Sequence, residues 1–378
     1  MSPGSVGVVE TRYLDLPAPL PLDCGRELSG VRVAYETYGT LSPGRDNVIL
    51  VCHALSGDAH AAGIAATPPE EGTREGYARG LGWWDGMIGP GKAFDTDRWF
   101  VVSTNLLGGC RGTTGPSSID PATGEPYGPD FPVITVADMV RCERAFLDVL
   151  GVERLAAVAG GSLGGMQALQ WAVDYPDQVT SIVVIASTHA LQPQGVAWNA
   201  IARESIMRDP DWQGGRYYGT GRSPDAGMGV ARMVGHITYL SAPGLAEKFG
   251  RRFQNGLNYT ITEPEYEVES YLRYQAAAFV RRFDANTYLY LSRALTYFEL
   301  GPAALNRIKA RTLLIAFSSD WLYPPAASRE ISEILGSSAE FHVIDAPHGH
   351  DCFLLEEARQ TPIVRRFLQE ATEREGTA

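Results

Sequence analysis

Ser162 has the neighbours that point most clearly to chemistry. It lies between Gly160 and Gly164, after the apolar run 155–159 and before the helical pattern 164–175. A strand, a sharp turn and a helix in this order raise a serine hydroxyl above the end of a sheet, and the glycines remove the Cβ atoms that would clash there. A chain with 41 glycines could contain the pattern by chance. Its position between a strand and a helix nevertheless favours a nucleophile, because the helix N-terminus stabilises developing negative charge.

A serine nucleophile needs a base to remove its proton and a carboxylate to orient that base. Asp320 lies just after the apolar run 312–317, and His350 lies just after the run 341–344. The order serine, acid, histidine along the chain is the one found with nucleophile elbows. We therefore predict that Ser162, Asp320 and His350 form a catalytic triad.

Two nearby residues compete for these roles. His348 follows a proline and is expected to be a loop residue, whereas Gly349 frees the loop at His350 and a helix begins beside it. Asp345 is the alternative acid, but it is too close in sequence to His350 to approach its far nitrogen easily. We therefore favour His350 over His348, and Asp320 over Asp345.

Backbone amides near Ser162 would have to stabilise the oxyanion of the reaction. In proteins with this elbow one N–H comes from the residue after the nucleophile, here Leu163, and another from the loop after an early strand. That loop is HALSGDAH at 53–60, in which Leu55 is the candidate donor. An ordinary loop at a strand end is the alternative interpretation of this segment.

The elements that must position these residues follow an alternating pattern. Val- and Ile-rich runs that are apolar on both faces are typical of buried parallel strands, and helical patterns lie between several of them. Such alternation indicates a parallel sheet covered by helices on both faces. The predicted strands are 31–35, 47–52, 99–104, 155–159, 181–186, 312–317 and 341–344, and the clearest predicted helices are 136–150 and 164–175.

The alternation stops after the fifth run and resumes near residue 312. We predict an α/β-hydrolase fold: a mostly parallel central sheet with helices on both faces and an inserted helical lid. Residues 1–187 and 302–378 would form the catalytic core and 188–301 the lid, with 267–282 as one of its helices. The stretch 108–132 is dense in Gly, Pro, Ser and Thr and is expected to be a functional or mobile loop.

Composition excludes several functional classes. The 378 residues carry 32 Lys and Arg against 44 Asp and Glu, a net charge of -12, which argues against nucleic acid or an anionic membrane as a partner. No apolar run reaches the roughly 18 residues of a transmembrane helix, and no signal peptide is recognised. Five scattered cysteines without C-x-x-C spacing suit a reducing compartment, so we expect a cytoplasmic protein. The histidines lack metal-ligand spacing, so no metal site is predicted.

Four motifs together resemble one family. The segments HALSGDAH at 53–60, NLLGGCRGTTGPSS at 105–118, GGSLGGMQ at 160–167 and PHGHD at 347–351 are similar to those of the homoserine O-acyltransferases of the MetX type. The resemblance covers about residues 35–355, including the lid. One departure is Leu163, where many members carry Met, but that residue supplies only a backbone amide.

The resemblance implies a ping-pong reaction in methionine biosynthesis. An acetyl group would pass from acetyl-CoA to Ser162 and then to the hydroxyl of L-homoserine. The family's substrate-binding arginine and aspartate match Arg232 and Asp351, which suits a zwitterion whose carboxylate needs a guanidinium and whose ammonium needs a carboxylate. The family also implies a homodimer and no tightly bound cofactor, with acetyl-CoA as a co-substrate.

Other reactions remain open from the residues alone. A succinyl donor, or serine or a deacetylated cephalosporin as acceptor, would need the same triad. An esterase or thioesterase, which passes the acyl group to water, is the alternative of another class. For the CoA phosphates the arginine pairs 251–252 and 281–282 are candidates, although solvated helix faces explain them equally well.

Overall fold

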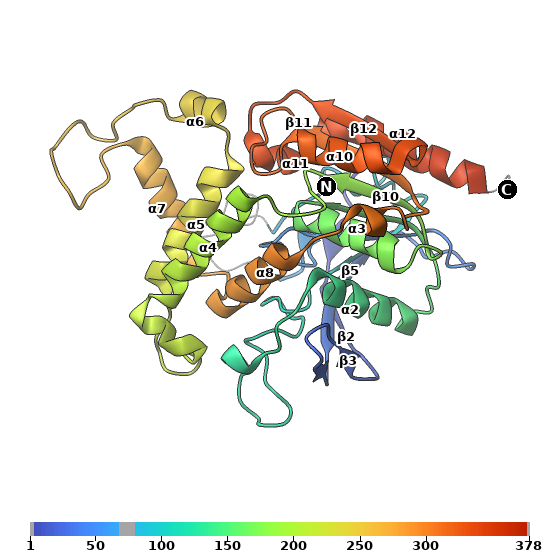
Figure 1. The fold of residues 1–378 in the computed structure, drawn as a ribbon, viewed down its shortest axis with the longest axis horizontal. Coiled ribbons are helices and arrows are strands. Elements are labelled where there is room, and N and C mark those ends of the chain that lie inside the picture. The colour runs from blue at the N-terminus through green and yellow to red at the C-terminus, as the bar shows by residue number, and fades with distance from the viewer. Residues whose placement is uncertain (1–3, 68–79, 376–378) are drawn as a thin grey trace.

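The computed structural model describes residues 4–67 and 80–375, and of 372–375 it describes only the backbone. The described residues form an eight-stranded sheet in the order β12-β11-β10-β9-β6-β8-β5-β2 (Figure 1). Neighbouring strands from β12 to β8 are parallel, whereas β5 is antiparallel to both β8 and β2. The strands are β2 (Arg12–Asp15), β5 (Arg32–Tyr38), β6 (Val48–Cys52), β8 (Phe100–Thr104), β9 (Leu155–Gly161), β10 (Val179–Ile185), β11 (Arg311–Phe317) and β12 (Ala339–Ile344).

The mostly parallel sheet predicted from the sequence is confirmed, with differences at its margins. The first predicted strand, 31–35, continues to Tyr38 and pairs antiparallel with β8. β9 runs on through Gly161 and therefore ends directly at Ser162. Short strands near the N-terminus had no apolar run to reveal them. They are β1 (Val8–Val9) paired with β7 (Ile64–Ala65), and β3 (Leu20–Pro21) paired with β4 (Glu27–Leu28).

Each face of the sheet carries its own apolar core, which explains the continuous apolar runs. In β6, Val48 and Leu50 belong to one buried cluster, and Ile49 and Val51 to the other. Successive side chains of a strand point to opposite faces, so both must be apolar when both faces are covered. The first cluster includes residues of α2 (Val136–Val149), α3 (Leu163–Asp174) and α10 (Pro325–Leu335), and the second includes residues of α12 (Glu357–Glu375).

The described residues between β10 and β11 form helices in place of further strands of the sheet. Figure 1 shows α4, α5 and α7 gathered at one side of the molecule, with α8 between them and the sheet. α7 begins with a capping box, in which the Glu269 side chain accepts the N–H of Tyr266. The helices are α4 (Pro193–Met207), α5 (Asp225–Tyr239), α6 (Ala242–Lys248), α7 (Glu267–Val280) and α8 (Ala285–Tyr297). The predicted lid, 188–301, contains all of them, and its separation from the core as a domain remains a prediction.

The long loop 108–132 is held from two sides. Its Thr113 and Thr114 hydroxyls accept N–H groups of β5 at 3.0 and 2.8 Å. On the other side the Tyr290 hydroxyl of α8 donates to the carbonyl oxygen of Phe131 at 2.7 Å. The loop therefore links the antiparallel edge of the sheet to the helices beyond it.

No helix in the described part of the chain is long and apolar enough to cross a membrane. The shorter helical segments are α9 (Pro302–Leu305), α11 (Cys352–Leu355) and the 3-10 helices η1 (Gly128–Asp130), η2 (Pro210–Gly215), η3 (Gly336–Ser338) and η4 (Gly349–Asp351).

Candidate active site

Ser162 occupies the turn between β9 and α3 with a backbone φ of 57°, in the left-handed region that non-glycine residues rarely adopt. The structure gives a steric reason for the flanking glycines. A Cβ atom on Gly164 would lie 2.0 Å from the carbonyl oxygen of Cys52, and one on Gly160 would lie 2.7 Å from the same atom. The elbow is therefore pressed against the end of β6, and only glycine fits on either side of the serine.

Asp320 and His350 meet in the interior, and their catalytic roles stay a prediction. Nδ1 of His350 donates to Oδ2 of Asp320 at 2.8 Å, and both side chains are almost fully buried. Oδ1 of Asp320 accepts the backbone N–H groups of Leu322 and Tyr323 at 3.0 and 2.9 Å, which fixes the carboxylate. With a proton on Nδ1, the neutral imidazole has its basic lone pair on Nε2.

The two competing residues lie elsewhere. Nε2 of His348 is 3.8 Å from the Glu356 carboxylate, and its side chain is 44% exposed. Asp345 accepts the Ser318 hydroxyl at 2.5 Å and is not the carboxylate on the buried histidine. Gly349, between the two histidines, has a φ of 70°, in the left-handed region that favours glycine.

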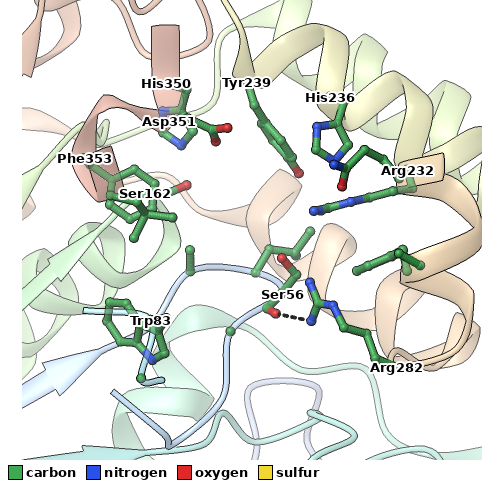
Figure 2. Close-up of a pocket in the computed structure, with 18 of the residues that line it drawn as sticks. Ser56, Trp83, Ser162, Arg232, His236, Tyr239, Arg282, His350, Asp351 and Phe353 are labelled. Atoms are coloured by element: carbon green, nitrogen blue, oxygen red, sulfur yellow. Dashed lines mark hydrogen bonds between the residues drawn. The ribbon is translucent and has the colours of Figure 1, made fainter. Parts of the chain in front are cut away.

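A cavity of about 270 Å³ opens above the elbow (Figure 2). Its walls come from the loop after β6, from α5 and α7, and from the segment around η4. Six of the candidate site residues named from the sequence line it: Ser162, His350, Arg232, Asp351, Leu55 and Arg282.

Arg232 and Asp351 bring opposite charges into this cavity. Arg232 of α5 is 8% exposed, and its guanidinium carbon lies 4.5 Å from the centre of the Phe279 ring. Asp351 ends η4, one residue after His350. Figure 2 shows Tyr239 between the two charged side chains. A guanidinium and a carboxylate within one cavity suit a ligand that carries both an anionic and a cationic group.

Tyr239 is protonated at neutral pH. Burial raises the pKa of its hydroxyl, the Arg232 charge opposes that increase, and the Asp351 charge adds to it. The hydroxyl can therefore donate a hydrogen bond to a ligand held between the two charges.

The two amides predicted to hold an oxyanion lie near the elbow. Leu163 is the first residue of α3, so its N–H has no acceptor within its own helix. Leu55 lies in the loop after β6, and Nη1 of Arg282 donates to the carbonyl oxygen of the next residue, Ser56, at 3.0 Å. Their role as oxyanion donors stays a prediction.

His53, at the start of that loop, is a structural residue. Its Nδ1 lies 2.7 Å from the carbonyl oxygen of Ala54, and its Nε2 lies 3.2 Å from the backbone nitrogen of Leu106 and 3.0 Å from Oδ1 of Asn105. Burial lowers the pKa of the ring despite these contacts. A neutral His53 therefore anchors the beginning of the loop that lines the cavity.

Several cavity residues were missed from the sequence. His236 and Tyr239 lie four and seven residues after Arg232, on the same face of α5, so helical spacing from Arg232 could have found them. Trp83 and Gln275 also line the cavity, but they come from distant segments, and no local pattern marks them.

The candidate CoA arginines separate in the structure. Arg282 lines the cavity. Arg251 donates to the Tyr266 hydroxyl at 2.9 Å, and Arg252 pairs with Glu267 at 2.8 Å, both at exposed positions.

Among the described residues no group of three or more His, Cys, Asp or Glu side chains could hold a metal ion.

Residues 47–357 match the family model described as alpha/beta hydrolase fold, so the chain is an α/β hydrolase in fold. It is 49% identical to the homoserine O-succinyltransferase of Bordetella petrii, over 97% of this chain and 88% of that protein. It is 47% identical to the homoserine O-acetyltransferase of Methanococcus vannielii, over 98% of this chain and 75% of that protein. Within the α/β hydrolases, the chain belongs to the homoserine O-acyltransferase family, which confirms the resemblance seen in the motifs.

Solved structures agree with this assignment. A homoserine O-acetyltransferase from Bacillus anthracis has a TM-score of 0.87 and 30% identity, with 96% of this chain and 98% of that one covered. Esterase E22 has a TM-score of 0.86 and 31% identity, with 95% of this chain and 100% of the esterase chain covered. The same fold thus occurs in proteins named for acyl transfer and for ester hydrolysis.

Proposed function

We propose that the protein transfers an acetyl group from acetyl-CoA to the side-chain hydroxyl of L-homoserine, as a step of methionine biosynthesis. The observation that carries the proposal is the presence of Arg232 and Asp351 in the same cavity as Ser162 and His350. A serine and a histidine alone would suit any acyl acceptor, including water. The two added charges suit the carboxylate and the ammonium of a free amino acid.

The first half-reaction forms an acyl-enzyme. Nε2 of His350 takes the proton of the Ser162 hydroxyl as its oxygen attacks the thioester carbonyl, and Asp320 stabilises the resulting imidazolium. The C–S bond then breaks, and the CoA thiolate leaves with the proton from His350. The amides of Leu55 and Leu163 would stabilise the tetrahedral oxyanion.

The second half-reaction transfers the acyl group. Homoserine enters with its carboxylate at Arg232 and its ammonium at Asp351. His350 takes the proton of the homoserine hydroxyl, the oxygen attacks the acyl-serine, and Ser162 leaves with that proton. The helices of the 188–301 segment exclude water, so that the positioned alcohol reacts before hydrolysis does.

The experiment that tests the proposal measures the mass of the intact protein after incubation with acetyl-CoA or succinyl-CoA. We expect a gain of about 42 Da from acetyl-CoA, lost on addition of homoserine, and no gain in Ser162→Ala. A gain of about 100 Da from succinyl-CoA, without acetylation, would mean that the donor is succinyl-CoA and not acetyl-CoA, as the name of the Bordetella petrii relative indicates for that protein. No gain from either thioester would contradict the acyl-enzyme.

Ester hydrolysis is a second candidate, favoured by the likeness to esterase E22. Release of CoA can be followed with a thiol reagent, with and without homoserine. Release that does not depend on homoserine would support a thioesterase in place of the transferase. The masses of products from homoserine, serine and other alcohols identify the acceptor.

The assembly and location proposed with this function are a homodimer in the cytoplasm. Light scattering of the purified protein measures the mass of the assembly, and a dimer would have twice the 41.0 kDa mass of the chain. Cell fractionation measures the location.

A further inference from the structure

A buried contact joins the loop after β6 to β5. Nδ1 of His60 lies 2.9 Å from Oε2 of Glu36, a side chain that is only 1% exposed. Nε2 of the same ring lies 2.7 Å from the carbonyl oxygen of Gly80. His60 is the last residue of the HALSGDAH motif, and the proposed reaction gives it no role.

The partners of the ring show that it is charged. A carboxylate and a carbonyl oxygen only accept, so both nitrogens of His60 must carry a hydrogen. Glu36 also accepts the hydroxyls of Thr11 and Tyr38, each at 2.8 Å. The Tyr38 oxygen already accepts the N–H of Ala61 at 2.8 Å, so its own hydrogen is available for Glu36. Three hydrogen-bond donors thus surround the Glu36 carboxylate, and the ring that donates to both Glu36 and Gly80 is an imidazolium.

His60 holds one wall of the cavity. Residues 81–83, which follow Gly80 directly, line the cavity, and we call them the 81–83 strip. His60 holds the strip directly, through the N–H of Trp83, which donates to the His60 carbonyl oxygen at 3.2 Å, and indirectly, through the contact of its ring with Gly80, the residue before the strip. The Trp83 indole N–H also donates to the carbonyl oxygen of Asp58 at 3.0 Å.

The approach between the strip and the loop is close. A Cβ atom on Gly82 would lie 2.2 Å from the backbone nitrogen of Ala62. The strip therefore lies directly against the residues that follow His60, which continue the loop that carries Leu55.

We propose that protonated His60 is a positioning residue, which holds the 81–83 strip and residues 54–57 in the geometry that acylation of Ser162 requires. The proposal rests on the proposed function, in that both need an acyl-Ser162. His60 itself does not touch the reacting atoms. It acts through the cavity wall, since displacements of about 1 Å can lower the rate of an enzymatic step about a hundredfold.

The contact should weaken as pH rises above the usual pKa of a histidine side chain. Burial lowers the pKa of His60. The hydrogen bond and charge of Glu36, the hydrogen bond to the Gly80 carbonyl and the charge of Asp58 outweigh burial, so the net effect is a pKa above the usual 6.5. Because the folded-state pKa is raised, the stabilisation is complete below 6.5 and is lost as pH rises through the folded value. A neutral ring can then donate to Glu36 or to Gly80, but not to both.

The charge of His60 can be measured directly. Long-range proton–nitrogen NMR spectra of the protein's seven histidine side chains, assigned with His60→Gln, report the protonation of each ring. We expect an imidazolium at His60 at pH 7 that titrates at higher pH. A neutral ring with a single tautomer at pH 7 would overturn the proposal, whatever the activity of the protein.

The positioning role is tested by the rate of Ser162 acylation, with acetyl-CoA and separately with p-nitrophenyl acetate, an activated ester that needs neither CoA nor homoserine. In His60→Gln and Glu36→Gln we expect this rate to fall about 10- to 100-fold and the alkaline limb of its pH profile to disappear. His342→Gln is the matched control, because His342 also contacts a glutamate, Glu340 at 2.5 Å, but on the edge strand β12, away from the cavity.

The outcomes separate the two proposals. Wild-type rates in both the His60 and the Glu36 variants, or an equal loss in the control, would overturn the positioning role. If His60→Gln does not fold, Glu36→Gln and the wild-type pH profile decide. Acylation by the activated ester without acylation by a CoA thioester would overturn the proposed function alone, and acylation by neither would overturn both.

Discussion

At the residue scale, the buried pair of His350 and Asp320 carries the clearest expectation. Asp320→Asn keeps the shape but favours the wrong tautomer of the imidazole, so the rate of acyl-enzyme formation should fall about 10⁴-fold. The burst of CoA release in a stopped-flow experiment measures it. Asp345→Asn is the control, since Asp345 contacts Ser318 instead of the histidine, and its burst should be unchanged. A larger loss in Asp345→Asn than in Asp320→Asn would contradict the assignment of the acid.

Arg232 is expected to act on the acceptor and not on the donor. Arg232→Lys keeps the charge but loses the planar fork, so the KM for homoserine should rise about tenfold while acylation by acetyl-CoA stays the same. Steady-state kinetics with varied homoserine and the mass of the acyl-enzyme separate the two effects. Arg251→Lys is the matched control, because Arg251 contacts an exposed tyrosine hydroxyl outside the cavity. Slower acylation in Arg232→Lys would mean that this residue serves the donor.

At the scale of the elements, the elbow depends on the contact of α3 with the end of β6. Gly164→Ala would place a Cβ atom 2.0 Å from the carbonyl oxygen of Cys52, so β6 or the helix must shift. We expect a loss of about 3 kcal/mol in the free energy of unfolding, together with most of the acylation rate. Urea denaturation followed by circular dichroism measures the first. Gly301→Ala is the control, since no atom lies within 4 Å of its added Cβ, and a similar loss there would contradict the steric explanation.

At the scale of the whole molecule, a buried carboxyl group joins α2, α3 and the sheet. Glu143 accepts the indole N–H of Trp171 at 2.6 Å and also contacts Thr104 and Cys52. Burial raises its pKa to about 7, although these hydrogen bonds lower it. Since the folded protein holds this proton more tightly than the unfolded chain, its contribution to stability falls as pH rises from about 4.5 to about 7.

Glu143→Gln should remove that dependence. Above pH 7 we expect the variant to be more stable than the wild type by up to about 3 kcal/mol, the equivalent of the shift in pKa, and below pH 4.5 the two should be similar. Urea denaturation across this pH range measures the difference. Glu10→Gln, at an exposed position, is the control and should follow the wild type at every pH. A variant that is less stable than the wild type above pH 7 would show that the ionised carboxylate is needed.

The parts of the site predicted from the sequence are those set by local geometry. Gly160, Ser162 and Gly164 lie within a single turn. Their spacing in the sequence reflects the close contact of that turn with β6, which excludes a Cβ atom at either glycine. Asp320 and His350 were found because each follows an apolar run, and the two runs form parallel strands that end at the same edge of the sheet. The antiparallel pairing of β5 was not foreseen, because a strand covered on both faces has the same apolar run in either direction.

The sequence by itself therefore determined the elbow, the placement of Asp320 and His350 after strands, and the alternation of strands and helices, because these depend on steric and periodic constraints between near neighbours. The tertiary structure alone decided which distant side chains share the cavity. Trp83 and Gln275 come from segments with no common pattern, and only packing brings them to the cavity that contains Ser162. The contact of His60 with Glu36 is of the same kind, since β5 and the loop after β6 meet only once the sheet has formed.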